Sequence, residues 1–219
     1  TMVGTKGYIT DVLTDRAIDF IRQKRREPFL CYVPYNTPHG PHQVPDRYFD
    51  KYKSLGLTDE VASVYAMVDN MDENIGRLLN TLKEAAIDDE TIVIFATDNG
   101  PNGKRFNGGM KGIKGSTDEG GVRSPLLVQF PKAIKPGTRV ETVAGAIDLL
   151  PTLTDLAGIQ AAFPKPLDGV SLKPDLLDRP SADPDRMRFA HWGGRVSVRT
   201  QRYRLDHTGK LYDLTNDPA

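Results

Sequence analysis

The chain has 219 residues, of which 38% are hydrophobic, and its 29 lysines and arginines balance 29 aspartates and glutamates. This length can bury the core of one large domain, or of one domain with a small appendage, and the zero net charge gives no support to a nucleic-acid or polyanion binder. No apolar run approaches the roughly 20 residues that a membrane span needs, and the single cysteine, Cys31, excludes an intrachain disulfide and a cysteine-rich metal site.

Two helices are predicted in the first part of the chain. Apolar residues recur at helical spacing over 9–21, and Thr10 or Asp11 can serve as the N-cap. A longer apolar stripe over 61–82 predicts the second helix. Asp72 falls near this stripe, so it belongs either to the polar face of the helix or to its buried side.

Short apolar runs predict buried strands on either side of the second helix. Pro28 stops the first helix, and the run 28–36 predicts a strand in which Cys31 is an inert, buried thiol. A loop rich in proline and histidine follows over 36–49. The run 91–96 predicts the next buried strand.

The middle of the chain combines a glycine-rich segment with further regular elements. Residues 100–121 show too little periodicity for regular structure, whereas 124–131 predicts another buried strand. A short helix is predicted over 148–159, with Asp148 as its N-cap and Gly158 as its stop. Helices that alternate with short apolar strands indicate an α/β sandwich around a mostly parallel central sheet.

The texture of the sequence changes at about residue 164. Prolines and aspartates punctuate the chain, and four short segments then predict antiparallel strands joined by tight turns: RFAHWGG, RVSVRTQ, YRLDHTG and KLYDL. The predicted organisation is therefore an α/β domain over 1–163, incomplete at its N-terminus, and a small antiparallel C-terminal subdomain over 164–219.

Polar residues follow two of the predicted strands, at the edge where open α/β sheets place their ligands. His39 lies in the loop after the first strand, Asp98 and Asn99 follow the second, and Lys111 and Lys114 come further along. Carboxylate and amide oxygens favour Ca²⁺ or Mg²⁺. A lysine can stabilise a developing oxyanion, and a histidine can donate a proton to a leaving oxygen. Together these residues suit an anionic substrate on a hard cation.

Each of these residues also has a simpler explanation. Asp-Asn-Gly by itself is most often a turn, and lysines among glycines are usually solvated. A histidine after a proline is usually a loop residue that hydrogen-bonds to the backbone, and His42 fits that description better than His39 does.

Four segments, in this order and at this spacing, resemble the type I sulfatase family of the alkaline phosphatase superfamily: YNTPHGPHQVPDRY, FATDNGP, GIKGSTDEGGVRSPLLVQFP and IDLLPTLTDLAGI. The final KLYDLTNDPA resembles the end of that family's C-terminal subdomain. The resemblance covers nearly the whole chain. It implies an alkaline-phosphatase-like fold and the hydrolysis of sulfate esters.

The resemblance also assigns roles to individual residues. It implies that Asp98 and Asn99 supply part of a divalent-cation site, usually for Ca²⁺. Lys114 matches the lysine that contacts the sulfate. His39 matches a histidine near the scissile oxygen, which makes it a candidate general acid.

Other residues of the same segments discriminate between related enzymes. Phosphatases of the superfamily usually carry a histidine where this chain has Asn99, so the asparagine favours a single hard cation and sulfate esters. Lys111 does not hold the position of the sulfate-binding lysine. Glu119 and Arg123 are expected to shape the loop rather than to take part in the chemistry.

The chain departs from the family in several respects. The nucleophile of these sulfatases is a formylglycine made from the first residue of a Cys/Ser-x-Pro-x-Arg motif, and this sequence contains no such motif. The paired aspartates of the first strand and the first Arg, Lys and His of the pocket are absent as well. We therefore expect the C-terminal part of a longer sulfatase, inactive by itself, with weak calcium affinity. Self-association through an exposed sheet edge is a further expectation.

Two alternatives stay open: a phosphoester or phosphonate hydrolase of the same superfamily, and a non-catalytic binding protein on a sulfatase scaffold. The expected partner is a sulfated small molecule or a sulfated carbohydrate. A tryptophan near several arginines would suit a sulfated sugar, although alternating arginines on a strand are more often ordinary surface. The residues in question are His191, Trp192, Arg195, Arg199 and Arg202. Members of the family are often exported, and the compartment of this protein is left open.

Overall fold

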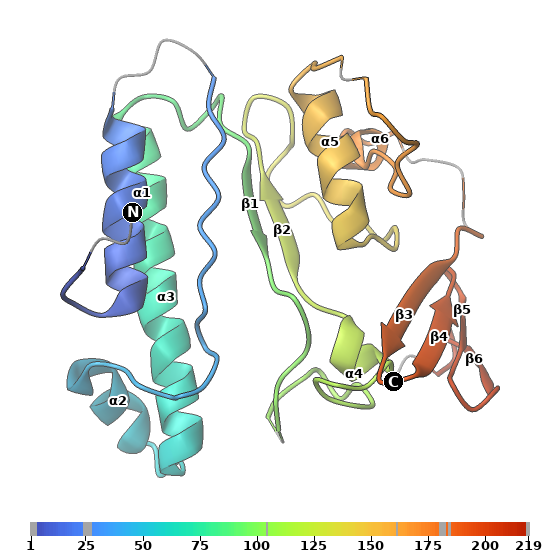
Figure 1. Cartoon of the computed structure of the whole chain (residues 1–219), viewed down its shortest axis with the longest axis horizontal. Coiled ribbons are helices and arrows are strands. Elements are labelled where there is room, and N and C mark those ends of the chain that lie inside the picture. The colour runs from blue at the N-terminus through green and yellow to red at the C-terminus, as the bar shows by residue number, and fades with distance from the viewer. Residues whose placement is uncertain are drawn as a thin grey trace. The chain divides into compact units, whose positions relative to one another are not determined.

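The computed structural model of the chain (Figure 1) describes residues 4–23, 28–103, 105–160, 162–179, 183 and 185–217. The chain divides into two compact units, Thr1–Thr91 and Ile92–Ala219. Among the described residues, no helix combines the length and the apolar character that a membrane crossing requires.

The first unit is helical. It contains α1 (Ile9–Arg22), α2 (Asp46–Lys53) and α3 (Asp59–Glu84), and both shorter helices pack against α3. The two helices predicted from the sequence are confirmed. The prediction missed α2, which begins inside the expected loop, because most of its residues are charged and only Tyr48 is buried. The buried apolar residues of the unit are Ala17, Ile18, Tyr48, Ala62, Val64, Ala66, Met67, Met71 and Leu82.

Polar side chains join α1 to its neighbours. Thr10 and Asp11 lie in the first turn of α1 and make no N-cap hydrogen bond, so their predicted role is wrong. Asp11 Oδ1 instead accepts hydrogen bonds from the side-chain amides of Asn70 (2.9 Å) and Asn74 (2.7 Å) on α3. Asp72 of α3 is exposed, so it belongs to the polar face of the helix and the buried alternative is wrong.

Residues 28–36 run without the hydrogen bonds of a strand, so the strand predicted there is wrong for this structure. An apolar run forms a strand only beside a hydrogen-bonding neighbour, and this segment pairs with none of the described strands. Leu30 and Tyr32 are 79% and 82% exposed. Cys31 is half-buried rather than buried, and this partial burial raises the pKa of its thiol, which favours the protonated form.

The opposite side of this segment is fixed to α1. The ring of Phe29 packs edge-on against Phe20, with 5.4 Å between the ring centroids. The Tyr35 hydroxyl lies 2.6 Å from Thr14 Oγ1. Among the described residues, side chains make the contacts that hold this segment against α1.

The second unit begins with a two-stranded sheet made of β1 (Val93–Ala96) and β2 (Leu126–Gln129). Both strands were predicted, but they pair antiparallel and are only partly buried. A mostly parallel sheet is therefore not found among the described strands, whereas the α/β class is confirmed. Self-association through a sheet edge stays a prediction.

Short helical segments follow the two strands or lie between them. They are α4 (Glu119–Val122), the 3-10 turn η1 (Ala146–Asp148), α5 (Leu149–Leu156) and α6 (Lys173–Leu176). The helix predicted over 148–159 corresponds to α5, and its predicted stop at Gly158 is confirmed. Gly158 comes shortly after α5 and has a φ of +67°, which favours glycine.

Asp148 occupies the N-cap position of α5, as predicted, but its side chain makes no capping hydrogen bond there. Its carboxylate is fully buried and accepts hydrogen bonds from the backbone N–H groups of Gly145 and Val170, each at 2.9 Å. It also accepts hydrogen bonds from the guanidinium groups of Arg186 (2.6 Å) and Arg188 (3.0 Å). Asp148 therefore fixes η1 to the start of the C-terminal sheet.

The C-terminal sheet is antiparallel, as predicted, with its four strands in sequence order (Figure 1). The strands are β3 (Arg188–Trp192), β4 (Arg195–Arg199), β5 (Tyr203–Leu205) and β6 (Leu211–Asp213). Gly193 and Gly194 form the turn between β3 and β4, and both have positive φ, as a two-residue hairpin of this type requires. A domain boundary at residue 164 stays a prediction.

Candidate functional site

Asp98 and Asn99 directly follow β1. Asp98 is exposed, and within the described chain no residue donates a hydrogen bond to its carboxylate or forms an ion pair with it. Asn99 is half-buried and donates from its amide nitrogen to the Gly100 carbonyl (2.9 Å), which leaves its Oδ1 available. The pair thus offers a carboxylate and an amide oxygen on adjacent residues. No cluster of three or more His, Cys, Asp and Glu side chains that could hold a metal occurs among the described residues.

A close backbone contact brings Lys114 to the same place. Gly100 N–H donates to the Gly121 carbonyl (3.0 Å), and a Cβ atom on Gly100 would lie 1.8 Å from the carbonyl oxygen of Gly120. Only glycine fits this approach. Lys114 N–H in turn donates to the Pro101 carbonyl (3.0 Å). The backbone of Lys114 therefore lies close to the segment that carries Asp98 and Asn99, and a site shared by the three side chains stays a prediction.

The two lysines of the glycine-rich segment differ in their surroundings. Lys111 lies 3.4 Å from Asp118 and 4.0 Å from Asp206, and it stands over the Tyr212 ring. Partial burial alone would lower the pKa of Lys111, but Asp118 and Tyr212 raise it. Lys114 is half-buried, and none of the described residues pairs with its ammonium group. Lys114 is therefore the lysine that can accept an external anion.

Buried charges anchor the loop that carries Lys114 to the C-terminal sheet. Glu119 is 2% exposed, and its Oε1 lies 3.0 Å from Arg199 Nε. Arg204 is 1% exposed and lies 3.4 Å from Asp118. Burial lowers the pKa of Arg199, and the adjacent Glu119 opposes this shift. Glu119 thus has a structural position, as expected, whereas the interpretation of Arg199 as solvated surface is wrong.

Two further aspartates lie in the last part of the sheet, Asp206 directly after β5 and Asp213 at the end of β6. The Asp206 carboxylate accepts hydrogen bonds from the hydroxyl and N–H of Thr208 and from the Tyr212 hydroxyl, and these bonds hold the pKa of Asp206 well below its usual range. Arg202 is exposed and pairs with Asp213 at 2.7 Å. Arg202 is therefore the surface residue that the sequence suggested.

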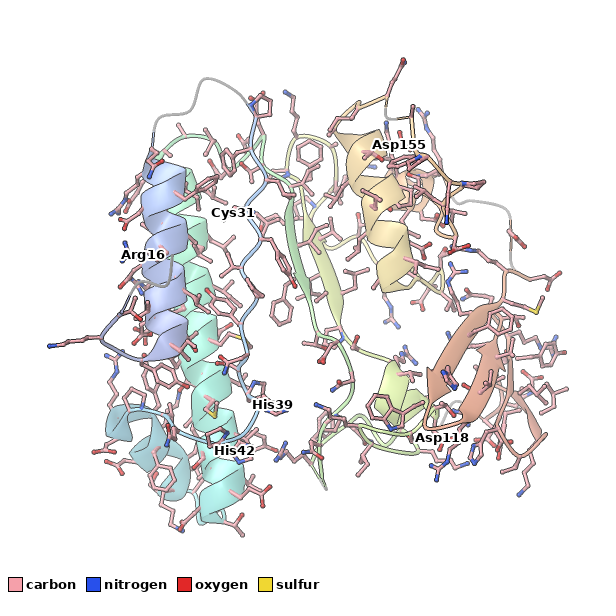
Figure 2. The ribbon with its side chains drawn as sticks, viewed as in Figure 1. Arg16, Cys31, His39, His42, Asp118 and Asp155 are labelled. Carbon is pink, nitrogen blue, oxygen red and sulfur yellow. The ribbon has the colours of Figure 1, made fainter. Side chains whose placement is uncertain are left out.

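His39 belongs to the first unit, where it lies with His42 in the loop before α2 (Figure 2). Its exposed ring donates from Nδ1 to the carbonyl of Gly40 (2.8 Å), which leaves Nε2 to exchange a proton. Within the described chain no residue hydrogen-bonds to the ring of His42, so the backbone-bonded histidine is His39 and not, as expected, His42. The convergence of His39 with the residues of the second unit stays a prediction.

Sequence reasoning missed the contacts of Ser197 and Arg204. Ser197 donates from its hydroxyl to the Thr117 carbonyl (2.8 Å), and the side chain of Arg204 is nearly inaccessible to solvent. The alternation in RVSVR does indicate that Arg195, Ser197 and Arg199 share one face of a strand. Which segment covers that face is a tertiary contact that the pattern does not specify.

The comparisons with known proteins agree with this architecture. The sulfatase family model matches residues 2–159, and the model of the C-terminal part of N-sulphoglucosamine sulphohydrolase matches residues 114–219. The uncharacterized sulfatase YdeN of Escherichia coli is 34% identical over 202 residues, which are 87% of this chain and 36% of that protein. Arylsulfatase A of Homo sapiens is 33% identical over 216 residues, which are 90% of this chain and 40% of that protein.

A solved structure shares the fold over the full length of the chain. The crystal structure of Ps i-CgsB in complex with k-i-k-neocarrahexaose superimposes with a TM-score of 0.91 at 29% identity, and the match covers 100% of this chain and 51% of that one. The chain spans less than half the length of the two relatives above and about half of this structure. With the family model matched over most of its residues, the chain belongs to the sulfatase family.

Proposed function

We propose that this chain forms the substrate-binding part of a sulfuric-ester hydrolase that acts on a sulfated carbohydrate. The observation that carries the proposal is Lys114, whose ammonium group pairs with none of the described residues and whose loop is held by buried charges and close glycine contacts near the segment of Asp98 and Asn99. Relatives named as sulfatases support a sulfate ester as substrate, and the related structure with k-i-k-neocarrahexaose supports a saccharide.

Each residue has a defined part in the proposed hydrolysis. Overall, an oxygen from water forms a bond to sulfur, the bond between sulfur and the ester oxygen breaks, the departing oxygen takes up one proton of that water, and the released sulfate carries the negative charge. Lys114 binds the sulfate oxygens and offsets the charge that develops on them. His39 donates a proton from Nε2 to the departing oxygen, while its Nδ1–H bond to Gly40 fixes the orientation of the ring.

We assign the two oxygens of Asp98 and Asn99 to a hard divalent cation, Ca²⁺, which when bound neutralises charge on the sulfate. Calcium takes about six to eight oxygen ligands, and two fall far short of that number. The 219-residue chain should therefore bind calcium with a dissociation constant weaker than about 10⁻⁴ M. Isothermal calorimetry measures this constant, with Asp98→Ala as the control, and tight stoichiometric binding would contradict the assignment.

The proposed activity is tested by sulfate release from a sulfated oligosaccharide. The enzyme is the product of the complete reading frame that contains these residues. Lys114→Ala should lower kcat/KM by about 100-fold, because it removes a positive charge from the sulfate in the transition state. Lys165→Ala, at an exposed position, is the matched control and should leave kcat/KM unchanged.

Two results would contradict the proposal: hydrolysis of phosphate or phosphonate esters in preference to sulfate esters, or full activity of Lys114→Ala. The 219-residue chain alone should not turn over an aryl sulfate, since its sequence contains no Cys/Ser-x-Pro-x-Arg motif.

A further inference from the structure

Trp192, the single tryptophan of the chain, lies at the end of β3 and is 60% exposed. The nitrogen edge of its indole faces Gly115, because a Cβ atom built on that glycine would lie 3.5 Å from Trp192 Nε1. Gly115 directly follows Lys114, the lysine that we assign to the sulfate. An exposed aromatic ring therefore stands next to the residue that follows the proposed anion-binding lysine.

The contacts of β4 show how the hairpin lies along the lysine loop. Ser197 contacts Thr117, and two residues further along Arg199 contacts Glu119. Alternate residues of a strand share one face, so this face of β4 follows the loop in the direction of increasing residue number on both segments. Two residues before Ser197 on the strand is Arg195, and two residues before Thr117 on the loop is Gly115. The same spacing therefore places Arg195 near Gly115.

Arg195 and Trp192 are cross-strand partners in the β3–β4 register, so their side chains occupy the same face of the hairpin. Arg195 is exposed, and no ion pair joins it to any residue that the structure describes. Lys114 likewise has no ion-pair partner among the described residues, so Trp192 neighbours Gly115, which follows one such cation, and pairs across the strands with another. An isolated surface tryptophan would need no such neighbours, whereas a sugar that carries anionic groups would use all three.

We propose that Trp192 and Arg195 form a saccharide subsite next to Lys114 and thereby select a sulfated pyranose as substrate. The indole face stacks on the apolar C–H face of the sugar ring, and Arg195 binds a second anionic group by paired hydrogen bonds. The inference rests on the proposed function, since it takes Lys114 as the group that binds the reacting sulfate.

The single tryptophan makes the test direct, because the fluorescence of the unlabelled chain reports Trp192 alone. A sulfated galactan tetrasaccharide should shift or quench this emission with saturation, and its desulfated counterpart should bind about tenfold more weakly or worse. In calorimetry, Trp192→Ala should weaken binding by about tenfold and Arg195→Ala by about threefold. Trp192→Phe, which keeps a stacking ring, should restore most of the affinity.

A matched control and a second ligand separate this inference from the proposed function. Arg202→Ala, on the same sheet and paired with Asp213, should bind the tetrasaccharide as the unchanged chain does. The affinity for inorganic sulfate, measured at constant ionic strength, should fall in Lys114→Ala and stay unchanged in Trp192→Ala.

Three outcomes are decisive against one claim or both. Unchanged affinity of Trp192→Ala for the tetrasaccharide, with affinity lost in Lys114→Ala, would overturn the subsite and leave the proposed function standing. The absence of any saturable change in Trp192 emission would overturn the subsite. Sulfate and tetrasaccharide binding that is insensitive to Lys114→Ala would overturn both.

Discussion

The helical unit and the glycine-rich loop of the second unit both bury polar side chains, but they do so in different ways. In the helices the buried polar residues are neutral, and Asn70 and Asn74 donate to Asp11 while the helix backbones satisfy their own hydrogen bonds. In the loop over 98–123 the buried side chains include the charged residues Glu119 and Asp118, and only α4 is regular. A segment with few periodic backbone bonds depends on individual contacts for its shape.

This difference bears on function because the loop, and not the helices, carries the proposed cation and sulfate ligands. Lys114 keeps its position through contacts that other residues of the loop make with the C-terminal sheet. We therefore expect single substitutions in the loop to be more damaging than comparable substitutions in the helical unit.

The largest effect is expected from replacing glycine by alanine at one position in each unit. Gly100→Ala would place a methyl group 1.8 Å from the Gly120 carbonyl oxygen, and should destabilise the second unit by about 3 kcal/mol. Gly76→Ala, in α3, meets nothing within 4 Å and should stabilise the first unit by about 0.5–1 kcal/mol. Urea unfolding, followed by Trp192 fluorescence and by helical circular dichroism, measures the two units separately. Equal changes in the free energy of unfolding from both substitutions would contradict the difference between the two units.

A smaller effect is expected from the buried charges. Arg204→Met removes the guanidinium group from Asp118 and leaves that carboxylate with Lys111 as its remaining partner, which should cost about 2–3 kcal/mol. Arg202→Met, two residues earlier on an exposed ion pair, should leave the free energy of unfolding nearly unchanged. Trp192 fluorescence in urea measures both variants. Equal losses of stability in both variants would show that burial of the charge does not decide its contribution to stability.

The smallest effect concerns acid. The Arg202 hydrogen bond and charge lower the pKa of Asp213 from 3.8 to about 2 in the folded chain. A lowered folded pKa means that this contribution is present above the unfolded pKa and is lost as the pH falls from about 3.8 towards about 2. The C-terminal sheet should therefore lose stability in this window, as Trp192 fluorescence reports, and Asp213→Asn should remove that part of the pH dependence. If NMR showed that the Asp213 carboxyl titrates near pH 3.8, the predicted lowering of its pKa would be contradicted.

Much of the fold follows from local patterns. The stripe over 61–82 predicts α3, and the alternating segments after residue 187 predict β3 to β6, since these periodicities reflect one buried face of each element. The run 28–36 fails as a strand because strand formation requires a partner, which its own residues do not encode. The segment of α2 gives no signal, because only Tyr48 is buried there.

The sequence by itself determined the family, the identity of the cation and sulfate ligands as candidates, and the order of most helices and strands. These depend on residue types and spacings that are local along the chain. Only the tertiary structure decided that Lys114 is unpaired while Lys111 is not, that Glu119 meets Arg199, and that Trp192 stands beside Gly115. The contacts of Glu119 with Arg199 and of Gly115 with Trp192 join residues that are far apart in sequence. They depend on how the C-terminal sheet packs against the loop, which local sequence patterns do not specify.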